Sequence, residues 1–301
     1  MKVAIIIVNF NNEDETTSYV EKIAKFNIIN KIVVVDNMST TIGAFEKLKK
    51  LEENIDKVSV IASNKNGGYS YGNNFGMKFL NTDEKEKNEK YDYIIVSNSD
   101  IDVEAKAVEN TIKVLEENKD VAIAAPRMFY KNDVPARRSS WKRRTPFRDM
   151  VHSTRLTEIL FLKVLKNGEY TSSDYEKEML EVEAIAGSFF VIKNDIFEKV
   201  NYLDDKVFLF YEEDILGKKI SDLGYKIISL NTEKFIHYES QTIGKVYNYF
   251  AKTRLLYKSR MYYQKTYNKI GIVSRLIFFL LYILRNIELL IEVPLRKLLK
   301  K

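Results

Sequence analysis

The sequence contains no cysteine, which excludes disulfide bonds, thiolate zinc sites and cysteine nucleophiles. This absence agrees with a reducing compartment. The chain starts with an apolar run at residues 3–8, but it lacks the basic leader, the longer apolar core and the cleavage site of a signal peptide. We therefore interpret residues 2–8 as a first buried strand, and we expect a cytoplasmic protein.

No G-x-G-x-x-G fingerprint follows this first strand, where a dinucleotide-binding dehydrogenase would carry it. An apolar run long enough to cross a membrane is also missing. The segment 270–293 is rich in Ile, Leu and Phe, but its longest uncharged stretch, Leu276–Leu284, has nine residues. A spanning helix needs about 20. We expect a helix that lies on an anionic membrane surface; packing on the body or against a second subunit of a homodimer is the alternative.

Positive charge is concentrated at the end of the chain. Residues 252–301 hold 12 Lys or Arg and 2 Glu, a balance of +10, so the other 251 residues carry −4 of the net +6. Such asymmetry indicates an anionic partner, either a membrane surface or a nucleic acid. No nucleic-acid-binding motif is present, and we therefore predict the membrane.

The first 125 residues alternate apolar strands with amphipathic helices, and the apolar fraction of 45% is ample for a core. Strands are predicted at 2–8, 31–35, 58–62, 93–96 and 121–125, and helices at 14–26, 44–51, 69–80 and 104–117. Further strands are predicted at 184–192, 225–230 and 234–237, with a helix at 215–223. This order predicts the α/β class, with a mixed, mostly parallel sheet flanked by helices and a C-terminal helical extension.

Two segments interrupt the alternation. The charged run 82–89 is predicted to be a solvated loop. The segment 127–149 is also predicted to be a loop, because Pro135 and Pro146 argue against one continuous helix. Within it, residues 137–148 hold six Lys or Arg and no acid, around the single Trp141. They are either a solvated loop or a clamp for the phosphates of an acceptor.

Polar clusters follow several of the predicted strands: Asp36-Asn37, Asn98 to Asp102, Glu212 to Asp214, and His237. Each has an ordinary explanation as a turn, a helix start or a buried imidazole. In a mainly parallel sheet, however, the carboxyl ends of strands gather at one edge. Asp100, Asp102 and Asn98 offer the oxygen ligands that a divalent cation prefers. Together the clusters predict a site that binds a metal and a phosphate and uses a carboxylate base.

Six motifs occur in order: Val8-Asn9-Phe10-Asn11, Asp36-Asn37-Met38-Ser39, Asn66-Gly67-Gly68-Tyr69 through Gly72-Asn73-Asn74, Ser97-Asn98-Ser99-Asp100, Gly187-Ser188 and Tyr211-Glu212-Glu213-Asp214. With these motifs, roughly residues 1–245 resemble the inverting family 2 glycosyltransferases of the GT-A fold, particularly their bacterial rhamnosyltransferase-like branch. The resemblance implies a GT-A domain over residues 1–250, with a donor half at about 1–125 and an acceptor half at about 126–250. Residues 251–301 would form a basic amphipathic helical extension.

The resemblance also implies roles for single residues. Asp36 would bond the nucleobase of a nucleotide-sugar donor, and the donor-binding set would comprise Asn9, Asp36, Asn37, Gly67, Gly68, Asn73, Asn74 and Asn98. Asp100 would hold Mg²⁺ or Mn²⁺ on the donor diphosphate, with Asp102 and His237 as further metal ligands. Asp214 would be the catalytic base, with Glu213 as the alternative. The acceptor would contact Ser188, Arg137, Arg138 and Trp141.

Three positions depart from the family pattern. Asn98 stands where many relatives have the first acid of the metal motif, so metal binding would rest on Asp100 alone or with Asp102. Thr41 and Leu216 replace acids that many relatives carry after Asp36 and after the base.

The expected activity is transfer of a sugar such as rhamnose to a cell-surface glycan or to a lipid-diphosphate-linked acceptor. The protein would act as a peripheral enzyme on the inner face of the cell membrane. The alternatives are a nucleotidyltransferase and a non-catalytic, membrane-associated binding module.

Overall fold

The computed structural model describes residues 1–83, 85–86, 88–161, 169–238 and 248–299. Within these ranges the core is a ten-stranded sheet with the order β3-β2-β1-β4-β11-β6-β12-β5, while β7 pairs with β6 and β9 with β12. The strands are β1 (Val3–Asn9), β2 (Lys31–Asp36), β3 (Val58–Ala62), β4 (Tyr93–Ser97), β5 (Ile101–Val103), β6 (Val121–Tyr130), β7 (Val134–Pro135), β9 (Met179–Val182), β11 (Phe189–Lys193) and β12 (Lys226–His237). A separate pair consists of β8 (Ser140–Trp141) and β10 (Ala184–Ile185).

The sheet is mixed, as predicted. Strand β1 runs parallel to β2 and β4, β2 runs parallel to β3, and β6 runs parallel to β12. Strand β11 lies antiparallel between β4 and β6. The central strands are buried on both faces, which explains their continuous apolar sequences.

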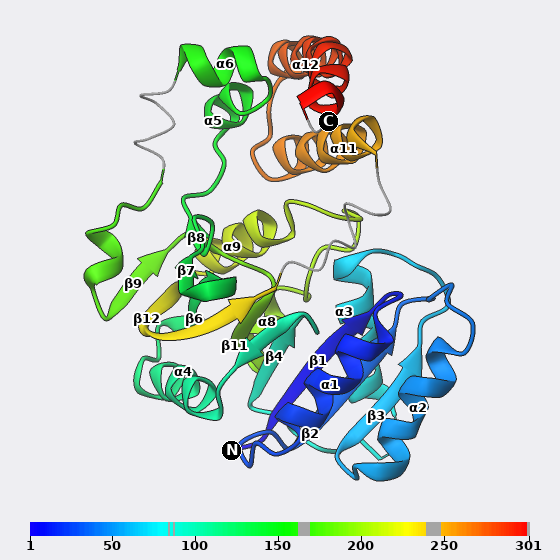
Figure 1. Ribbon diagram of the computed structural model, residues 1–301. Coiled ribbons are helices and arrows are strands. Elements are labelled where there is room, and N and C mark those ends of the chain that lie inside the picture. Colours follow the sequence, from blue (N-terminus) through cyan, green and yellow to red (C-terminus); the bar gives the residue numbers. More distant parts are fainter. Residues whose placement is uncertain (84, 87, 162–168, 239–247, 300–301) are drawn as a thin grey trace.

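Helices cover both faces of the sheet (Figure 1). The α-helices of the described residues are α1 (Glu13–Ile23), α2 (Ala44–Asn54), α3 (Tyr69–Thr82), α4 (Ala105–Glu117), α5 (Pro146–Val151), α6 (Arg155–Leu160), α8 (Asn194–Lys199), α9 (Glu212–Asp222), α11 (Tyr249–Thr266) and α12 (Ile272–Leu299). Helices α1, α2 and α4 pack on one face, and α3, α8 and α9 pack on the other. Each face therefore has its own hydrophobic core.

Some predicted boundaries are wrong. Strand β6 continues to Tyr130 because it stays paired with β12 as far as His237, and the rest of the predicted loop 127–149 contains β7, β8 and α5. The predicted strand 184–192 is two strands, since Gly187 and Ser188 separate β10 from β11. The predicted strands 225–230 and 234–237 are one strand, β12, with a register shift between Leu230 and Lys234. Residues 84 and 87 of the predicted loop 82–89 lie outside the described residues.

The C-terminal extension consists of α11 and α12. Tyr263 of α11 is buried against Val207, Tyr211 and Ile215, so this helix packs on the body. Helix α12 contacts α11 and α5, and Figure 1 shows α5, α6, α11 and α12 gathered at one end of the molecule. In the described part of the chain, no helix combines the length and apolar character needed to cross a membrane. The boundary near residue 250 stays a prediction.

Candidate functional site

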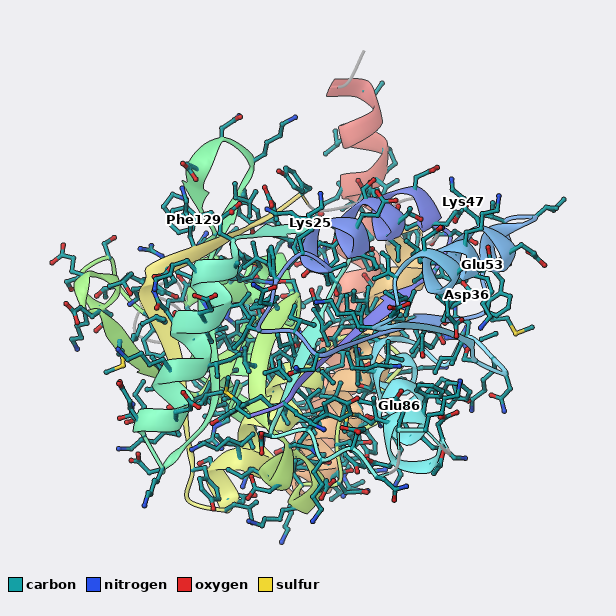
Figure 2. All side chains as sticks on the ribbon, turned by 90° about the horizontal axis from the view of Figure 1, so that it is seen from below. Lys25, Asp36, Lys47, Glu53, Glu86 and Phe129 are labelled. Atoms are coloured by element: carbon teal, nitrogen blue, oxygen red, sulfur yellow. The ribbon has the colours of Figure 1, made fainter. Side chains whose placement is uncertain are left out.

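Asn9 and Asp36 lie side by side at the carboxyl ends of β1 and β2. Their strands are in parallel register, and Asn9 Nδ2 donates to Asp36 Oδ1 at 3.0 Å. Thr16 fixes the other end of the Asn9 amide by donating to its Oδ1 at 2.8 Å, and the Ser39 hydroxyl donates to Asp36. In Figure 2, Asp36 lies on the side of the molecule that carries Lys47 of α2, opposite Phe129 of β6. These hydrogen bonds therefore fix the orientation of the Asp36 carboxylate at the end of the sheet where we predict donor binding.

Gly68 contacts both Asn37 at this donor end and Phe208, which lies shortly before the acidic cluster Glu212 to Asp214. Its φ is +87°, and a Cβ at this position would lie 1.9 Å from the carbonyl oxygen of Phe208. Asn37 Nδ2 donates to the Gly68 carbonyl at 3.1 Å. Glycine is required here both by the left-handed backbone and by the close approach of another chain segment.

Helix α3 begins directly after Gly68. Its first turn has no acidic residue and no side-chain cap, and the Tyr69 N–H already donates to the Phe208 carbonyl at 3.3 Å, so only the following N–H groups and the positive dipole end can take an anion such as a phosphate. Asn73 is buried, and its Nδ2 donates to the Tyr69 carbonyl at 3.0 Å. Asn74 exchanges two hydrogen bonds with the backbone of Leu203, at 2.9 and 3.1 Å. The structure therefore places Asn74 as a tether for the loop after α8. Gly67 packs against the ring of Tyr71.

Asp100 and His237, two of the three predicted metal ligands, lie in contact. Antiparallel pairing of β5 with β12 sets His237 opposite Ile101, and His237 Nε2 lies 3.3 Å from Asp100 Oδ1. Asp102 instead pairs with Lys22 of α1 and accepts from the Tyr238 hydroxyl at 3.5 Å. Among the described residues no three His, Cys, Asp or Glu side chains gather as metal ligands. Asp102 is thus separated from the other two predicted ligands.

Asn98 and Glu213 both contact the turn between β10 and β11. The Asn98 backbone N–H donates to the Ser188 carbonyl at 2.8 Å, and the Gly187 N–H donates to Glu213 Oε1 at 3.3 Å. The hydroxyl of Ser188 faces Met128 Sδ at 3.4 Å. The end of β4, this turn and the start of α9 therefore meet, which brings the donor end and the acidic cluster to one edge of the sheet.

Three acids, Glu212, Glu213 and Asp214, begin α9. The two residues before them, Phe210 and Tyr211, both have left-handed backbone, at φ 72° and 74°, which is strained for bulky side chains. Burial raises the pKa of Glu212 and of Glu213. Burial also raises the pKa of Asp214 to about 7, although the nearby Arg144 opposes this shift. A carboxyl with this pKa can exchange a proton near neutral pH.

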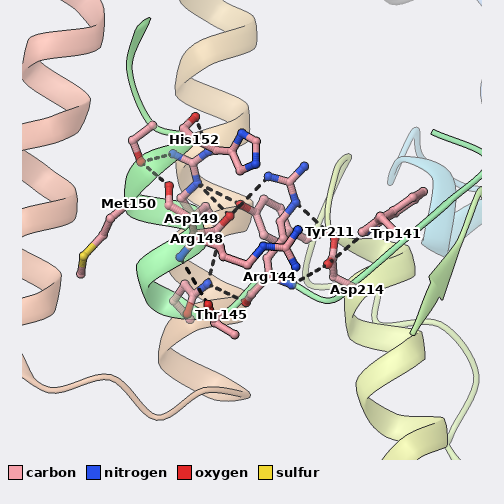
Figure 3. A network of polar contacts seen from close by, with 12 residues as sticks. Trp141, Arg144, Thr145, Arg148, Asp149, Met150, His152, Tyr211 and Asp214 are labelled. Carbon is pink, nitrogen blue, oxygen red and sulfur yellow. Dashed lines mark hydrogen bonds and ion pairs between the residues drawn. The ribbon is translucent and has the colours of Figure 1, made fainter. Parts of the chain in front are cut away.

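Asp214 is held by the segment that carries Trp141. Trp141 Nε1 donates to Asp214 Oδ1 at 3.2 Å, and the Arg144 backbone N–H donates to the same oxygen at 3.3 Å (Figure 3). Arg144 Nε lies 3.7 Å from Asp214 Oδ2. Arg137, in contrast, is exposed and pairs with Glu169 at 3.3 Å, and Arg138 is also exposed. Of the predicted acceptor residues, Trp141 therefore lies at Asp214, while Arg137 and Arg138 lie on the outer surface.

Sequence reasoning missed the buried polar residues behind Asp214. Asp149 is fully buried, and it accepts hydrogen bonds from the Tyr211 hydroxyl at 2.8 Å and from Gln264 Nε2 at 2.6 Å. The one signal in the sequence was local: Asp149 is the first acid after the basic run 137–148. Nothing in the pattern of α11 indicated that Gln264 would reach it.

Comparisons with known proteins agree with this arrangement. The model of the family described as "Glycosyl transferase family 2" matches residues 4–200. The low-salt glycan biosynthesis hexosyltransferase Agl10 of Haloferax volcanii is 26% identical over 210 residues, which cover 70% of this chain and 58% of that protein. The match thus takes in little more than half of the relative's length.

Solved structures share the fold at low sequence identity. GalNAc-T7, solved with UDP, GalNAc and Mn²⁺, has a TM-score of 0.61 at 14% identity, covering 79% of this chain and 44% of that one. The Pyrobaculum calidifontis mannosyltransferase PcManGT, solved with GDP-Man and Mn²⁺, has a TM-score of 0.56 at 12% identity, covering 90% of this chain and 65% of that one. S. aureus TarS 1-349, in complex with UDP-GlcNAc, has a TM-score of 0.55 at 13% identity, covering 92% of this chain and 70% of that one. The predicted GT-A fold is confirmed, and because the family model matches most of its length, the chain belongs to glycosyltransferase family 2.

Proposed function

We propose that this protein transfers a sugar from a nucleotide-sugar donor to an acceptor hydroxyl, with inversion at the anomeric carbon and with Asp214 as the base. The observation that carries the proposal is the contact chain from Asn98 through Ser188 and Gly187 to Glu213, which joins the donor end to the acidic cluster. The Haloferax relative, a hexosyltransferase, and two solved neighbours, which hold GDP-Man and UDP-GlcNAc, support this substrate class.

In the proposed reaction, one carboxylate acts in one displacement. Asp214 takes the proton from the acceptor hydroxyl as its oxygen forms a bond to the anomeric carbon. The bond from that carbon to the phosphate oxygen breaks, and a nucleoside diphosphate leaves with the bonding electron pair. Because attack comes from the face opposite the leaving group, the configuration inverts. The N-terminal N–H groups of α3 and the side chains of Asn9 and Asp36 would hold the donor.

The residues present fit a divalent cation that is shared with the donor. Asp100 and His237 supply one oxygen and one nitrogen, and a cation bound to a nucleotide takes its other ligands from phosphate and water. Mn²⁺ accepts such a mixed donor set, while Mg²⁺ prefers oxygen alone. When bound, the cation would stabilise the negative charge on the departing diphosphate.

We further propose that the acceptor is linked to a lipid diphosphate and that the protein lies on the inner face of the cell membrane. Apolar side chains are exposed along α12 and α6, among them Leu280, Ile287 and Ile159. An open groove of about 580 Å³ lies between α11 and α12, lined by Arg254 and Lys258 together with Phe250 and Tyr282. Helix α11 has no acidic residue to neutralise these cations. An apolar surface combined with a basic groove suits an anionic lipid surface.

A thermal-shift screen of nucleotide sugars with Mg²⁺ or Mn²⁺ tests the proposal and identifies the donor, of which nucleotide-linked rhamnose is the first candidate. With the donor found, Asp214→Asn is expected to abolish transfer while it keeps donor binding. Release of pyrophosphate instead of a nucleoside diphosphate would identify a nucleotidyltransferase. The absence of nucleotide binding under every metal condition would indicate a binding module.

A further inference from the structure

The described residues contain a buried polar network behind Asp214 that links three distant parts of the chain. We name it the Asp149 network; its members are Arg144, Asp149, Tyr211, Arg260 and Gln264. We infer that Arg144 is the positioning residue for Asp214, and that the other members hold Arg144 in place, so that helix α11 completes the active site. The inference rests on the proposed role of Asp214 as the base.

Arg144 contacts two carboxylates at once. Its Nε lies 3.7 Å from Asp214 Oδ2, and its Nη1 lies 3.4 Å from Asp149 Oδ1 (Figure 3). Its backbone N–H also binds Asp214 Oδ1 at 3.3 Å. A guanidinium has several donors in a fixed plane, so it can bridge two acids in a way that a lysine ammonium cannot. Arg144 therefore contacts both oxygens of Asp214, one of which also accepts the indole N–H of Trp141.

Asp149 holds the far side of Arg144. Its carboxylate is fully buried and accepts from the Tyr211 hydroxyl at 2.8 Å and from Gln264 Nε2 at 2.6 Å. A buried carboxylate needs such partners because an unpaired one is strongly unfavourable. Tyr211 has a left-handed backbone and comes directly before the acidic cluster. Because its hydroxyl is bonded to Asp149, this hydrogen bond also fixes the start of α9.

Helix α11 closes the network from the C-terminal side. Arg260 Nε donates to the Tyr211 hydroxyl at 2.9 Å, and Arg260 Nη1 donates to Ser153 Oγ at 2.7 Å. Gln264 Nε2 and Asn268 Nδ2 both donate to the Arg144 carbonyl, at 3.3 and 3.1 Å. Positions 260 and 264 are four residues apart, which places them on one face of α11, and Asn268 follows shortly after the helix ends at Thr266. That face binds the backbone and the partners of Arg144.

Several charged or titratable groups influence the ionisation of Asp214. They are Arg144, Arg148 and Asp149 from the segment before α6, Glu212 and Glu213 from α9, and Tyr263 from α11. Arg144 lowers the pKa of Asp214, while Asp149 and Glu213 raise it. If Arg144 positions Asp214 as inferred, removing Arg144 and removing the charge of Asp149 must shift this ionisation in opposite directions. A merely structural role predicts no such opposition.

The single tryptophan allows a test that needs no substrate. Trp141 donates its indole N–H to Asp214, so its fluorescence is expected to change when Asp214 gains a proton. In the full-length protein, titration from pH 5 to pH 9 should show a midpoint near 7, which Asp214→Asn should remove. His152 should not contribute, since burial lowers its pKa to about 4.

Arg144→Gln should move the midpoint up by about one pH unit, and Asp149→Asn should move it down. Arg144→Lys keeps the charge but cannot bridge both acids, so its midpoint should lie between those of the wild type and Arg144→Gln. Lys265→Gln is the matched control, because it removes a charge from the exposed side of α11 next to Gln264 and should leave the midpoint unchanged. Circular dichroism checks that each variant is folded.

Equal midpoints in the wild type, Arg144→Gln and Arg144→Lys would overturn the inference, as would shifts of the same sign in Arg144→Gln and Asp149→Asn. In the transfer assay, Arg144→Gln should lower kcat by about 100-fold with the donor KM unchanged. Loss of donor affinity with kcat kept would also overturn it. If Asp214→Asn still transfers sugar, the proposed base is wrong, whereas the fluorescence result for Arg144 stands by itself.

Discussion

His237 Nε2 lies 3.3 Å from Asp100 Oδ1, although the two residues are far apart in the sequence. The short strand β5 makes this contact possible, since it pairs Ile101 with His237 directly after Asp100. The same pairing sets Asp102 opposite Ile236, where its carboxylate pairs with Lys22. Strand geometry therefore separates two acids that lie two positions apart in the sequence.

The first prediction follows from this separation. Asp100→Asn and His237→Asn should each weaken Mn²⁺-dependent binding of a nucleoside diphosphate by at least about tenfold, because each removes one of the two proposed protein ligands. Asp102→Asn is the matched control and should bind as the wild type does, since its carboxylate faces Lys22. Isothermal titration calorimetry with and without Mn²⁺ measures these affinities. An equal loss in Asp102→Asn would show that Asp102 also serves the metal.

The second prediction concerns pH. Burial raises the pKa of Asp214 to about 7, so the carboxyl is mostly protonated below this pH and mostly ionised above it. Only the ionised form can accept the acceptor proton, and kcat should therefore fall by about tenfold for each pH unit below 7 and level off above it. The profile should be measured from pH 5 to pH 9 at saturating donor. A rate that stays level down to pH 5 would contradict this assignment.

The strand-end clusters were predictable because they depend on local patterns. Buried parallel strands have continuous apolar sequences, and the polar residues that follow them must lie at one edge of the sheet. Asn9 and Asp36 are adjacent for this reason, and Asp100 lies beside His237 at the same edge. The order of strands and helices indicated the fold class in the same way.

Contacts between distant segments, including the Asp149 network, were not predictable from local patterns. Whether Asn74 faces a donor or the Leu203 backbone depends on the path of a loop far along the chain. The contacts of Arg260 and Gln264 depend on how α11 docks, and helical periodicity shows which residues share a face but not what that face meets. Basic composition left a solvated loop and a phosphate clamp as alternatives for 137–148, yet the side chain of Arg144 is partly buried and contacts two acids of the protein itself.

The third prediction tests the close approach at Gly68. Gly68→Ala places a Cβ 1.9 Å from the Phe208 carbonyl oxygen, so the segment before the acidic cluster must move. Gly43→Ala is the matched control, because Gly43 has a similar φ of +77° with no atom within 4 Å of the added Cβ. The control should lose about 1 kcal/mol of unfolding free energy from backbone strain alone. Gly68→Ala should lose several times as much, with weaker donor binding, as measured by chemical denaturation and calorimetry. Equal losses would show that contact with Phe208 is unimportant.

The fourth prediction concerns the surface formed by α11 and α12. Arg254→Gln combined with Lys258→Gln should reduce binding to vesicles that contain anionic lipid by about 30-fold, since each of the two cations near such a surface contributes about 1 kcal/mol. Leu280→Asp and Ile287→Asp should reduce binding to anionic and to neutral vesicles alike, because their side chains are exposed on α12. Leu223→Asp, at an exposed position after α9, is the control and should bind as the wild type does.

Co-sedimentation at low and high salt separates the two contributions to vesicle binding, because salt screens the basic groove and leaves apolar insertion intact. If neither pair of variants changes vesicle binding but Leu280→Asp converts a dimer into a monomer, the apolar residues of α12 cover a second subunit instead of a lipid surface. Light scattering of the same variants decides between these outcomes. Arg254 and Lys258 of α11 line the groove together with Tyr282 of α12, and α12 also carries the exposed Leu280 and Ile287, so a lipid partner should be sensitive to changes in both sets.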